Sequence, residues 1–154
     1  MNNKLMKFTG TAAHLAATAT ATAAAAPGDH PSLNLPVTQL QYSPAGVRDG
    51  VPSKIQFAPA FGNPSTGAHG TFAKMPAGFV SPIHTHTEDY YAVVISGVGV
   101  NIVPGGTDVP LPPGSYWFQK GGERHITKCI STNECVFFIN SQGKYDYIPD
   151  APKN

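Results

Sequence analysis

Charged residues are scarce in this 154-residue chain, and long apolar runs are missing from it. Lysine, arginine, aspartate and glutamate make up 12% of the residues, with 10 basic and 9 acidic side chains. Because these charges form no basic cluster, we expect no nucleic-acid partner. No stretch combines the length and the hydrophobicity of a membrane-spanning helix, so we expect no membrane span either.

Common catalytic sequence motifs are also lacking. The chain contains neither a Gly-x-Ser-x-Gly nucleophile motif nor a His-Glu-x-x-His zinc motif. Its short glycine clusters at 97–99 and 121–122 lack the strand–loop–helix context of a phosphate-binding loop. We therefore interpret both clusters as turns.

Long amphipathic helices are missing too, whereas glycine and proline are abundant, at 16 and 15 residues. This composition favours short strands joined by turns, and the length suits one domain with its own core. We therefore predict an all-β fold, an antiparallel barrel or jelly roll between residues 37 and 150. The expected strands lie at 37–42, 54–61 (ending at Pro59), 70–78, 90–97, 98–103 (pairing back across Gly97) and 136–140, with a hairpin at 129–135.

Residues 1–26 contain no acidic side chain. Lys4 and Lys7 precede an Ala/Thr-rich run that ends in four alanines before Pro27. A basic start, an uncharged middle and small residues at the end predict a cleaved secretory signal peptide, followed by a linker at 27–36. Cleavage would leave 8 basic and 9 acidic residues and would give a periplasmic or extracellular protein. The alternative is a disordered Ala/Thr tail.

Three histidines carry the strongest functional signal. His84 and His86 are two residues apart, so their side chains share one face of an extended strand, and His125 follows later in the chain. Three imidazoles suit a divalent transition metal, and ligand type alone does not distinguish Fe, Zn, Mn, Ni and Cu. His69 lies among small residues and is expected to be an exposed loop residue, with the mouth of the barrel as the alternative.

The segment around His84 resembles the first motif of the cupin superfamily. That motif reads Gly, five residues, His-x-His, three or four residues, Glu, six residues, Gly. Here Gly78, His84, His86 and Gly97 fit the spacing, and Tyr90 occupies the position of the family's glutamate. Some cupin dioxygenases are built on three histidines, so the resemblance still allows a redox metal.

The segment around His125 resembles the second cupin motif. That motif reads Gly, five residues, Pro-x-Gly, two residues, His, three residues, Asn. Gly114, Gly122 and His125 fit it, while Lys120 replaces the proline and Cys129 replaces the asparagine. Residues 55–147 also resemble uncharacterised single-domain cupins related to the cupin domain of some anti-sigma factors. The resemblance implies a cupin-type antiparallel β-barrel, or double-stranded jelly roll, with a metal at its inner face.

The fourth metal position is left open by the sequence. Tyr90 has the right spacing, but a phenol with a pKa of about 10 is a poor ligand unless a metal lowers that pKa. Glu88 is the better ligand chemically, although it falls in the expected turn. We favour water at this position, with Tyr90 hydrogen-bonded to it and thereby the candidate catalytic residue.

Cys129 and Cys135 are the only cysteines. In an exported protein they could form a disulfide, and two buried free thiols are the alternative. Residues 90–96 are apolar on both faces, which predicts a covered outer face. The cover would come from a second subunit in a homodimer or from the chain itself.

Two functional hypotheses follow from these observations. The first is an exported metalloprotein, a metal-dependent dioxygenase or isomerase acting on a small organic substrate. The second is a non-catalytic module that binds or senses a small ligand. One such fold hosts many functions, so the motifs alone do not choose between them.

Overall fold

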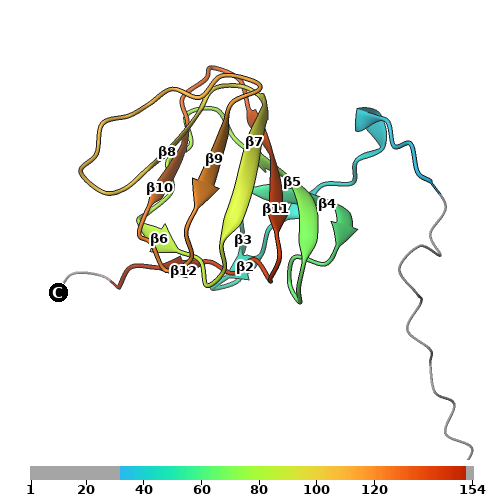
Figure 1. Cartoon of the computed structure of the whole chain (residues 1–154), viewed down its shortest axis with the longest axis horizontal. Coiled ribbons are helices and arrows are strands. Elements are labelled where there is room, and N and C mark those ends of the chain that lie inside the picture. Colours follow the sequence, from blue (N-terminus) through green and yellow to red (C-terminus); the bar gives the residue numbers. More distant parts are fainter. Residues whose placement is uncertain (1–31, 152–154) are drawn as a thin grey trace, which may run out of the picture. The chain divides into compact units, whose positions relative to one another are not determined.

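Antiparallel strands form nearly all the regular structure of the computed structural model, which describes residues 32–151 (Figure 1). The strands are β1 (Ser43–Pro44), β2 (Val47–Arg48), β3 (Val51–Pro52), β4 (Gln56–Gly62), β5 (His69–Met75), β6 (His84–Thr85), β7 (Tyr90–Ser96), β8 (Gly99–Ile102), β9 (Tyr116–Gln119), β10 (Ile126–Cys129), β11 (Cys135–Ser141) and β12 (Ile148–Pro149). One 3-10 turn, η1 (Val37–Gln39), precedes them. In this part of the chain no helix is long and apolar enough to cross a membrane. The predicted signal peptide at 1–26 lies outside the described residues.

The strands form one large sheet and several smaller pairs. The large sheet has the order β1-β4-β5-β11-β7-β9, and the pairs are β8 with β10, β6 with β12 and β2 with β3. Single bridges join Val80 to Lys128, His84 to His125 and Gly99 to Leu111, so the β8–β10 and β6–β12 pairs continue into each other. In Figure 1, β8, β10 and β6 lie on the left and β7, β11, β5 and β4 on the right. All named pairs are antiparallel, which confirms the predicted all-β class.

Alternation along β7 shows where the core lies. Tyr90, Ala92 and Val94 are buried, whereas the residues between them face outward and are exposed. The inward side chains of β5, β9, β10 and β11 meet those of β7. Trp117 of β9, for example, packs edge-on against Phe137 of β11 with ring centroids 5.2 Å apart. The interior is therefore apolar at its centre, and β6, which begins with His84, lies at the lower end of the strands in Figure 1.

Two expected strand pairings are wrong. Residues 98–103 were expected to pair back across Gly97, but β8 pairs with β10 because both edges of β7 are already taken by β11 and β9. Residues 129–135 do not form a hairpin either. β10 pairs with β8, and β11 lies between β5 and β7, so 129–135 crosses from one group of strands to the other.

The N-terminal strand expectations also need correction. Residues 37–39 form the exposed turn η1 rather than a strand, because no neighbouring strand pairs with them. β4 does not end at Pro59 but continues to Gly62, with a register shift between Pro59 and Phe61. Because β1 covers only the start of β4, the missing N–H of Pro59 falls at an open edge, where proline is tolerated.

Cys129 and Cys135 are joined by a disulfide, with their Cα atoms 5.7 Å apart. Both residues are almost completely buried. The bond connects the end of β10 to the start of β11 and so links the two groups of strands. A disulfide of this kind persists in oxidising compartments, so it is compatible with an exported protein.

Candidate metal centre

Backbone pairing places His84 and His125 opposite each other. His84 at the start of β6 forms an antiparallel bridge with His125, which directly precedes β10. His86 lies just beyond β6, and its carbonyl accepts a hydrogen bond from the N–H of Gly122 at 2.8 Å. Backbone hydrogen bonds alone therefore bring the segments of the two sequence motifs together.

The three imidazoles form one buried group. His84, His86 and His125 are 3%, 2% and 1% exposed. Their ring centroids lie 4.1 Å apart for His84 and His125, 4.9 Å for His84 and His86 and 5.1 Å for His86 and His125. One ligand atom from each lies within 4.8 Å of the other two.

Hydrogen bonds to backbone carbonyls orient all three rings. Nδ1 of His84 donates to the carbonyl of Pro82 at 2.9 Å, and Nδ1 of His125 donates to the carbonyl of Glu123 at 3.0 Å. Nδ1 of His86 donates to the carbonyl of Asp146. A carbonyl can only accept, so the proton of each neutral ring sits on Nδ1 and the lone pair on Nε2.

Burial keeps these rings neutral. Desolvation, together with the neighbouring His125, lowers the pKa of His84 to about 3, and desolvation lowers the pKa of His86 to about 4. The pKa of His125 is also lowered, chiefly by burial. A neutral imidazole is the form that binds a metal, so the site does not have to lose protons near neutral pH to accept one.

Two atoms of this cluster have no partner in the described structure. Nε2 of His86 and Nε2 of His125 are buried and form no hydrogen bond with described residues. A buried polar atom without a partner is costly, and a metal ion would satisfy both lone pairs at once. The donor set and these unpaired atoms therefore fit a divalent transition metal, without selecting which one.

The two candidates for the fourth position lie in different surroundings. The Tyr90 hydroxyl is buried and accepts a hydrogen bond from Trp117 Nε1 at 3.4 Å, and burial raises the pKa of Tyr90 to about 12. The Tyr90 ring lies edge-on to His86, with centroids 5.3 Å apart. Glu88 is exposed, and its side chain lies close to Gly143.

The C-terminal segment supplies three side chains that the motifs do not indicate. The ring of Tyr145 lies 4.4 Å from that of His86, and the ring of Tyr147 lies 4.6 Å from that of His84. The Asp146 carboxylate accepts hydrogen bonds from the backbone N–H of Thr87 at 2.8 Å and from its hydroxyl at 2.6 Å. These residues follow the motifs in the sequence, and the pairing of β12 with β6 together with the bonds between Asp146 and Thr87 brings them to the site.

His69 is not an exposed loop residue, so that expectation is wrong. It begins β5, is 1% exposed and shares a hydrogen bond between Nδ1 and the hydroxyl of Thr71 at 2.8 Å. Its side chain points inward because it has the strand parity of Thr71, which also faces the interior. Its ring lies edge-on to Tyr145 at 6.2 Å. His69 is not a member of the three-histidine group.

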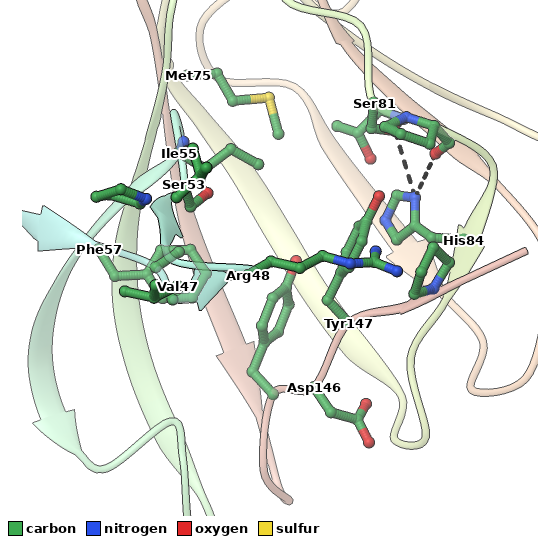
Figure 2. Close-up of a pocket in the computed structure, with 18 of the residues that line it drawn as sticks. Val47, Arg48, Ser53, Ile55, Phe57, Met75, Ser81, His84, Asp146 and Tyr147 are labelled. Carbon is green, nitrogen blue, oxygen red and sulfur yellow. Dashed lines mark hydrogen bonds between the residues drawn. The ribbon is translucent and has the colours of Figure 1, made fainter.

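A pocket of about 780 Å³ opens beside His84 (Figure 2). Its walls come from the β2–β3 hairpin, the start of β4, the end of β5 and the C-terminal segment 145–149. Figure 2 shows His84 at one side of this space, with its hydrogen bonds to Ser81 and to Pro82 drawn. A small molecule in the pocket would therefore lie next to one histidine of the cluster.

Comparisons with known proteins agree with this fold. No curated protein sequence matches the chain significantly. Among solved structures, the chain is similar to an RmlC-like cupin protein from Ralstonia eutropha JMP134, with 19% identity, a TM-score of 0.60 and coverage of 80% of this chain and 76% of that one. It is also similar to the polyketide cyclase RemF from Streptomyces resistomycificus, with 14% identity, a TM-score of 0.62 and coverage of 80% and 89%.

A chain of the complex between SigE and the anti-sigma ChrR from Rhodobacter sphaeroides is similar as well. The identity is 13% and the TM-score 0.53, with coverage of 70% of this chain and 51% of that one. These likenesses establish the cupin fold, as the motifs predicted. A family model described as a domain of unknown function, DUF4437, matches residues 55–153. The chain therefore belongs to the DUF4437 family, and it has a cupin fold.

Proposed function

We propose that this chain is a metalloprotein that holds one divalent transition metal ion through Nε2 of His84, His86 and His125. The observation that carries the proposal is the common orientation of the three rings, each with Nδ1 bonded to a backbone carbonyl. Three protein ligands leave at least one position for water or substrate, which is typical of catalytic rather than structural metals. We infer a dioxygenase or isomerase acting on a small organic molecule.

The metal is one of Fe, Zn, Mn, Ni and Cu, and when bound it would supply Lewis-acid polarisation of a substrate oxygen or, if redox-active, chemistry with O₂. Tyr90 would orient the ligand that completes the site. Its raised pKa keeps the phenol protonated, so Tyr90 can donate a hydrogen bond or a proton. Glu88 has no part in this proposal, because its exposed side chain lies against Gly143.

Metal content tests the proposal directly. Protein purified without an affinity tag should contain close to one equivalent of a transition metal, and His125→Ala should lose most of it. His69→Gln is the matched control, because His69 is equally buried and also has an unpaired Nε2 but lies outside the group. Full occupancy in His125→Ala would show that the three-histidine site is wrong. Tyr90→Phe should keep the metal and change ligand binding or turnover.

A sensing module is the second candidate function. It is favoured by the likeness to a chain of the SigE–ChrR complex, which pairs a sigma factor with an anti-sigma factor. In this case the pocket beside His84 would bind a small molecule without converting it. Saturable ligand binding without turnover in the metal-loaded protein would favour the sensor over the enzyme.

We propose that the mature protein is exported, with a signal peptide at 1–26, a linker at 27–36 and the cupin domain at 37–150. The disulfide between Cys129 and Cys135 supports an oxidising compartment. The intact mass of protein recovered from the periplasm or the medium should correspond to a start near residue 27. An unchanged mass would refute cleavage.

We also propose a homodimer. Tyr91, Val93 and Ile95 on the outer face of β7 are 55%, 39% and 48% exposed, and Tyr116 and Phe118 on the edge strand β9 are 68% and 47% exposed. Among the described residues nothing covers these side chains, and a second copy could bury them. Light scattering should then give twice the monomer mass, and Phe118→Lys should reduce it to the monomer mass.

A further inference from the structure

The pocket beside His84 is built mostly from apolar side chains. Its volume of about 780 Å³ falls within the range of about 300–1,000 Å³ that is usual for small-molecule sites. The apolar walls include Val47, Val51, Ile55, Phe57, Met75 and Phe79. A ligand that fills this space must therefore present a largely apolar body.

Arg48 is the only lysine or arginine among the residues that line this pocket. Figure 2 shows its side chain extended across the space, with the guanidinium on the side of Tyr147 and His84. Arg48 and Tyr147 both line the pocket. Arg48 and His84 therefore face the same cavity, and Tyr147, which packs on His84, lies in its wall as well.

The position of Arg48 is set by a tight hairpin. Asp49 and Gly50 have φ values of 50° and 77°, and such a two-residue turn with positive φ at both positions matches the twist of the flanking strands. The hairpin is tied down at its base, where Ser53 N–H donates to the carbonyl of Gly46 at 2.8 Å. The Arg48 side chain therefore starts from an ordered strand, β2.

The acidic residues of the pocket leave the guanidinium available. Asp49 approaches Arg48 Nε only to 4.0 Å, and its side chain is 94% exposed. An exposed ion pair at that distance contributes little. The Asp146 carboxylate is held by Thr87 and lies 3.8 Å from Lys144 Nζ. Arg48 thus keeps donors that can form a two-pronged contact with a ligand carboxylate.

We propose that the pocket binds a small carboxylic acid with an apolar body, its carboxylate held by Arg48 on the side of His84 and its body packed against the apolar walls. As a statement about the substrate of the metal centre, this rests on the function proposed above. The carboxylate contact belongs to Arg48, however, and can be measured separately from metal content.

Nitrogen NMR gives a selective view of that contact. The chain has only two arginines, Arg48 and Arg124, so the Nε–H region of a ¹⁵N-labelled sample should hold two side-chain signals. Titration with hexanoate should shift the Arg48 signal and leave Arg124, which is bonded to Asp150, in place. Hexanamide has the same shape without the charge and should cause a much smaller shift.

Calorimetry on matched variants measures the size of the effect. Arg48→Gln should weaken hexanoate binding about two- to fivefold, the range for an ion pair whose arginine is largely exposed to water. Lys54→Gln removes the same charge from an exposed residue next to the hairpin that does not line the pocket, and it should bind hexanoate like the wild type. Metal content is recorded for every sample.

The outcomes separate the two proposals. Equal hexanoate affinity in wild type and Arg48→Gln, or equal loss in Lys54→Gln and Arg48→Gln, would overturn the role of Arg48. Absence of hexanoate binding in a wild-type sample that retains its metal would overturn the ligand class and leave the metal centre standing. A metal-free wild type in which Arg48 still binds hexanoate would support the pocket and contradict the proposed function.

Discussion

His84 and His125 are directly opposed on neighbouring antiparallel segments and exchange both backbone hydrogen bonds. The N–H of His84 donates to the carbonyl of His125 at 3.1 Å, and the N–H of His125 donates to the carbonyl of His84 at 2.9 Å. Strand register alone therefore brings two site imidazoles together. The third, His86, is fixed by the hydrogen bond from Gly122 to its carbonyl.

Gly121→Ala should weaken the metal centre although Gly121 is not one of its ligands. A Cβ at Gly121 would overlap the carbonyl oxygen of Thr87, so the loop of the second motif could no longer close on the turn after His86. We expect a loss of about 1–3 kcal/mol in the free energy of unfolding and weaker metal retention. Urea denaturation measures the first. Gly67→Ala is the control, because a Cβ there meets nothing within 4 Å. Equal stability of the two variants would refute the close contact.

Asp146→Ala should lower metal affinity without removing a ligand. The Asp146 carboxylate ties the C-terminal segment to Thr87, and that segment places the carbonyl that orients His86. Loss of such support typically costs about 10–100-fold in metal affinity. Competition with a chromogenic chelator measures the change. Asp108→Ala, which breaks a surface ion pair with Lys128, should keep the wild-type affinity. Unchanged affinity in Asp146→Ala would show that the segment does not support the site.

The sequence predicted the fold class and the three-histidine group because both depend on short-range patterns. Spacing within a strand decides which side chains share a face, and the two cupin motifs mark the segments that pair. The C-terminal tyrosines were not predicted because Tyr145 and Tyr147 reach the histidines through long-range contacts, the pairing of β12 with β6 and the bonds between Asp146 and Thr87. His69 escaped it for a similar reason, since its small neighbours suggested a loop while strand pairing with β11 buries it.

The order in which the strands pair was the other feature that the sequence did not predict. Residues 98–103 follow 90–96 after one glycine turn, a pattern that favours a local hairpin. The actual partner of β8 is β10, because the edges of β7 are filled by β9 and β11, two strands distant in sequence. Such competition for strand edges is decided by the whole fold and not by the segment.

Removal of the disulfide should destabilise the protein. A short closed loop such as the one between Cys129 and Cys135 contributes about 2–3 kcal/mol in the chain-entropy account. Denaturation with and without reductant should differ by that amount. In non-reduced exported protein, alkylation should modify neither cysteine. Two alkylatable thiols would contradict the disulfide.

Acid should destabilise the protein partly through His69. Burial lowers the pKa of His69 in the folded state, so the unfolded chain takes up its proton at a higher pH. The stabilisation is complete above the unfolded pKa of about 6.5 and is lost as the pH falls through the folded value. His69→Gln should therefore lose less stability than wild type between about pH 7 and pH 5. Parallel stability curves for the two proteins would refute this.

The central claim is that one metal ion lies between the three Nε2 atoms. Anomalous diffraction from crystals of untagged protein, recorded at the absorption edge of the metal found by elemental analysis, tests it most directly. A metal held by the three histidines should give a single peak about 2.0–2.1 Å from Nε2 of His84, His86 and His125. A metal-containing crystal with its peak elsewhere, or with any of the three rings turned away from the peak, would contradict it.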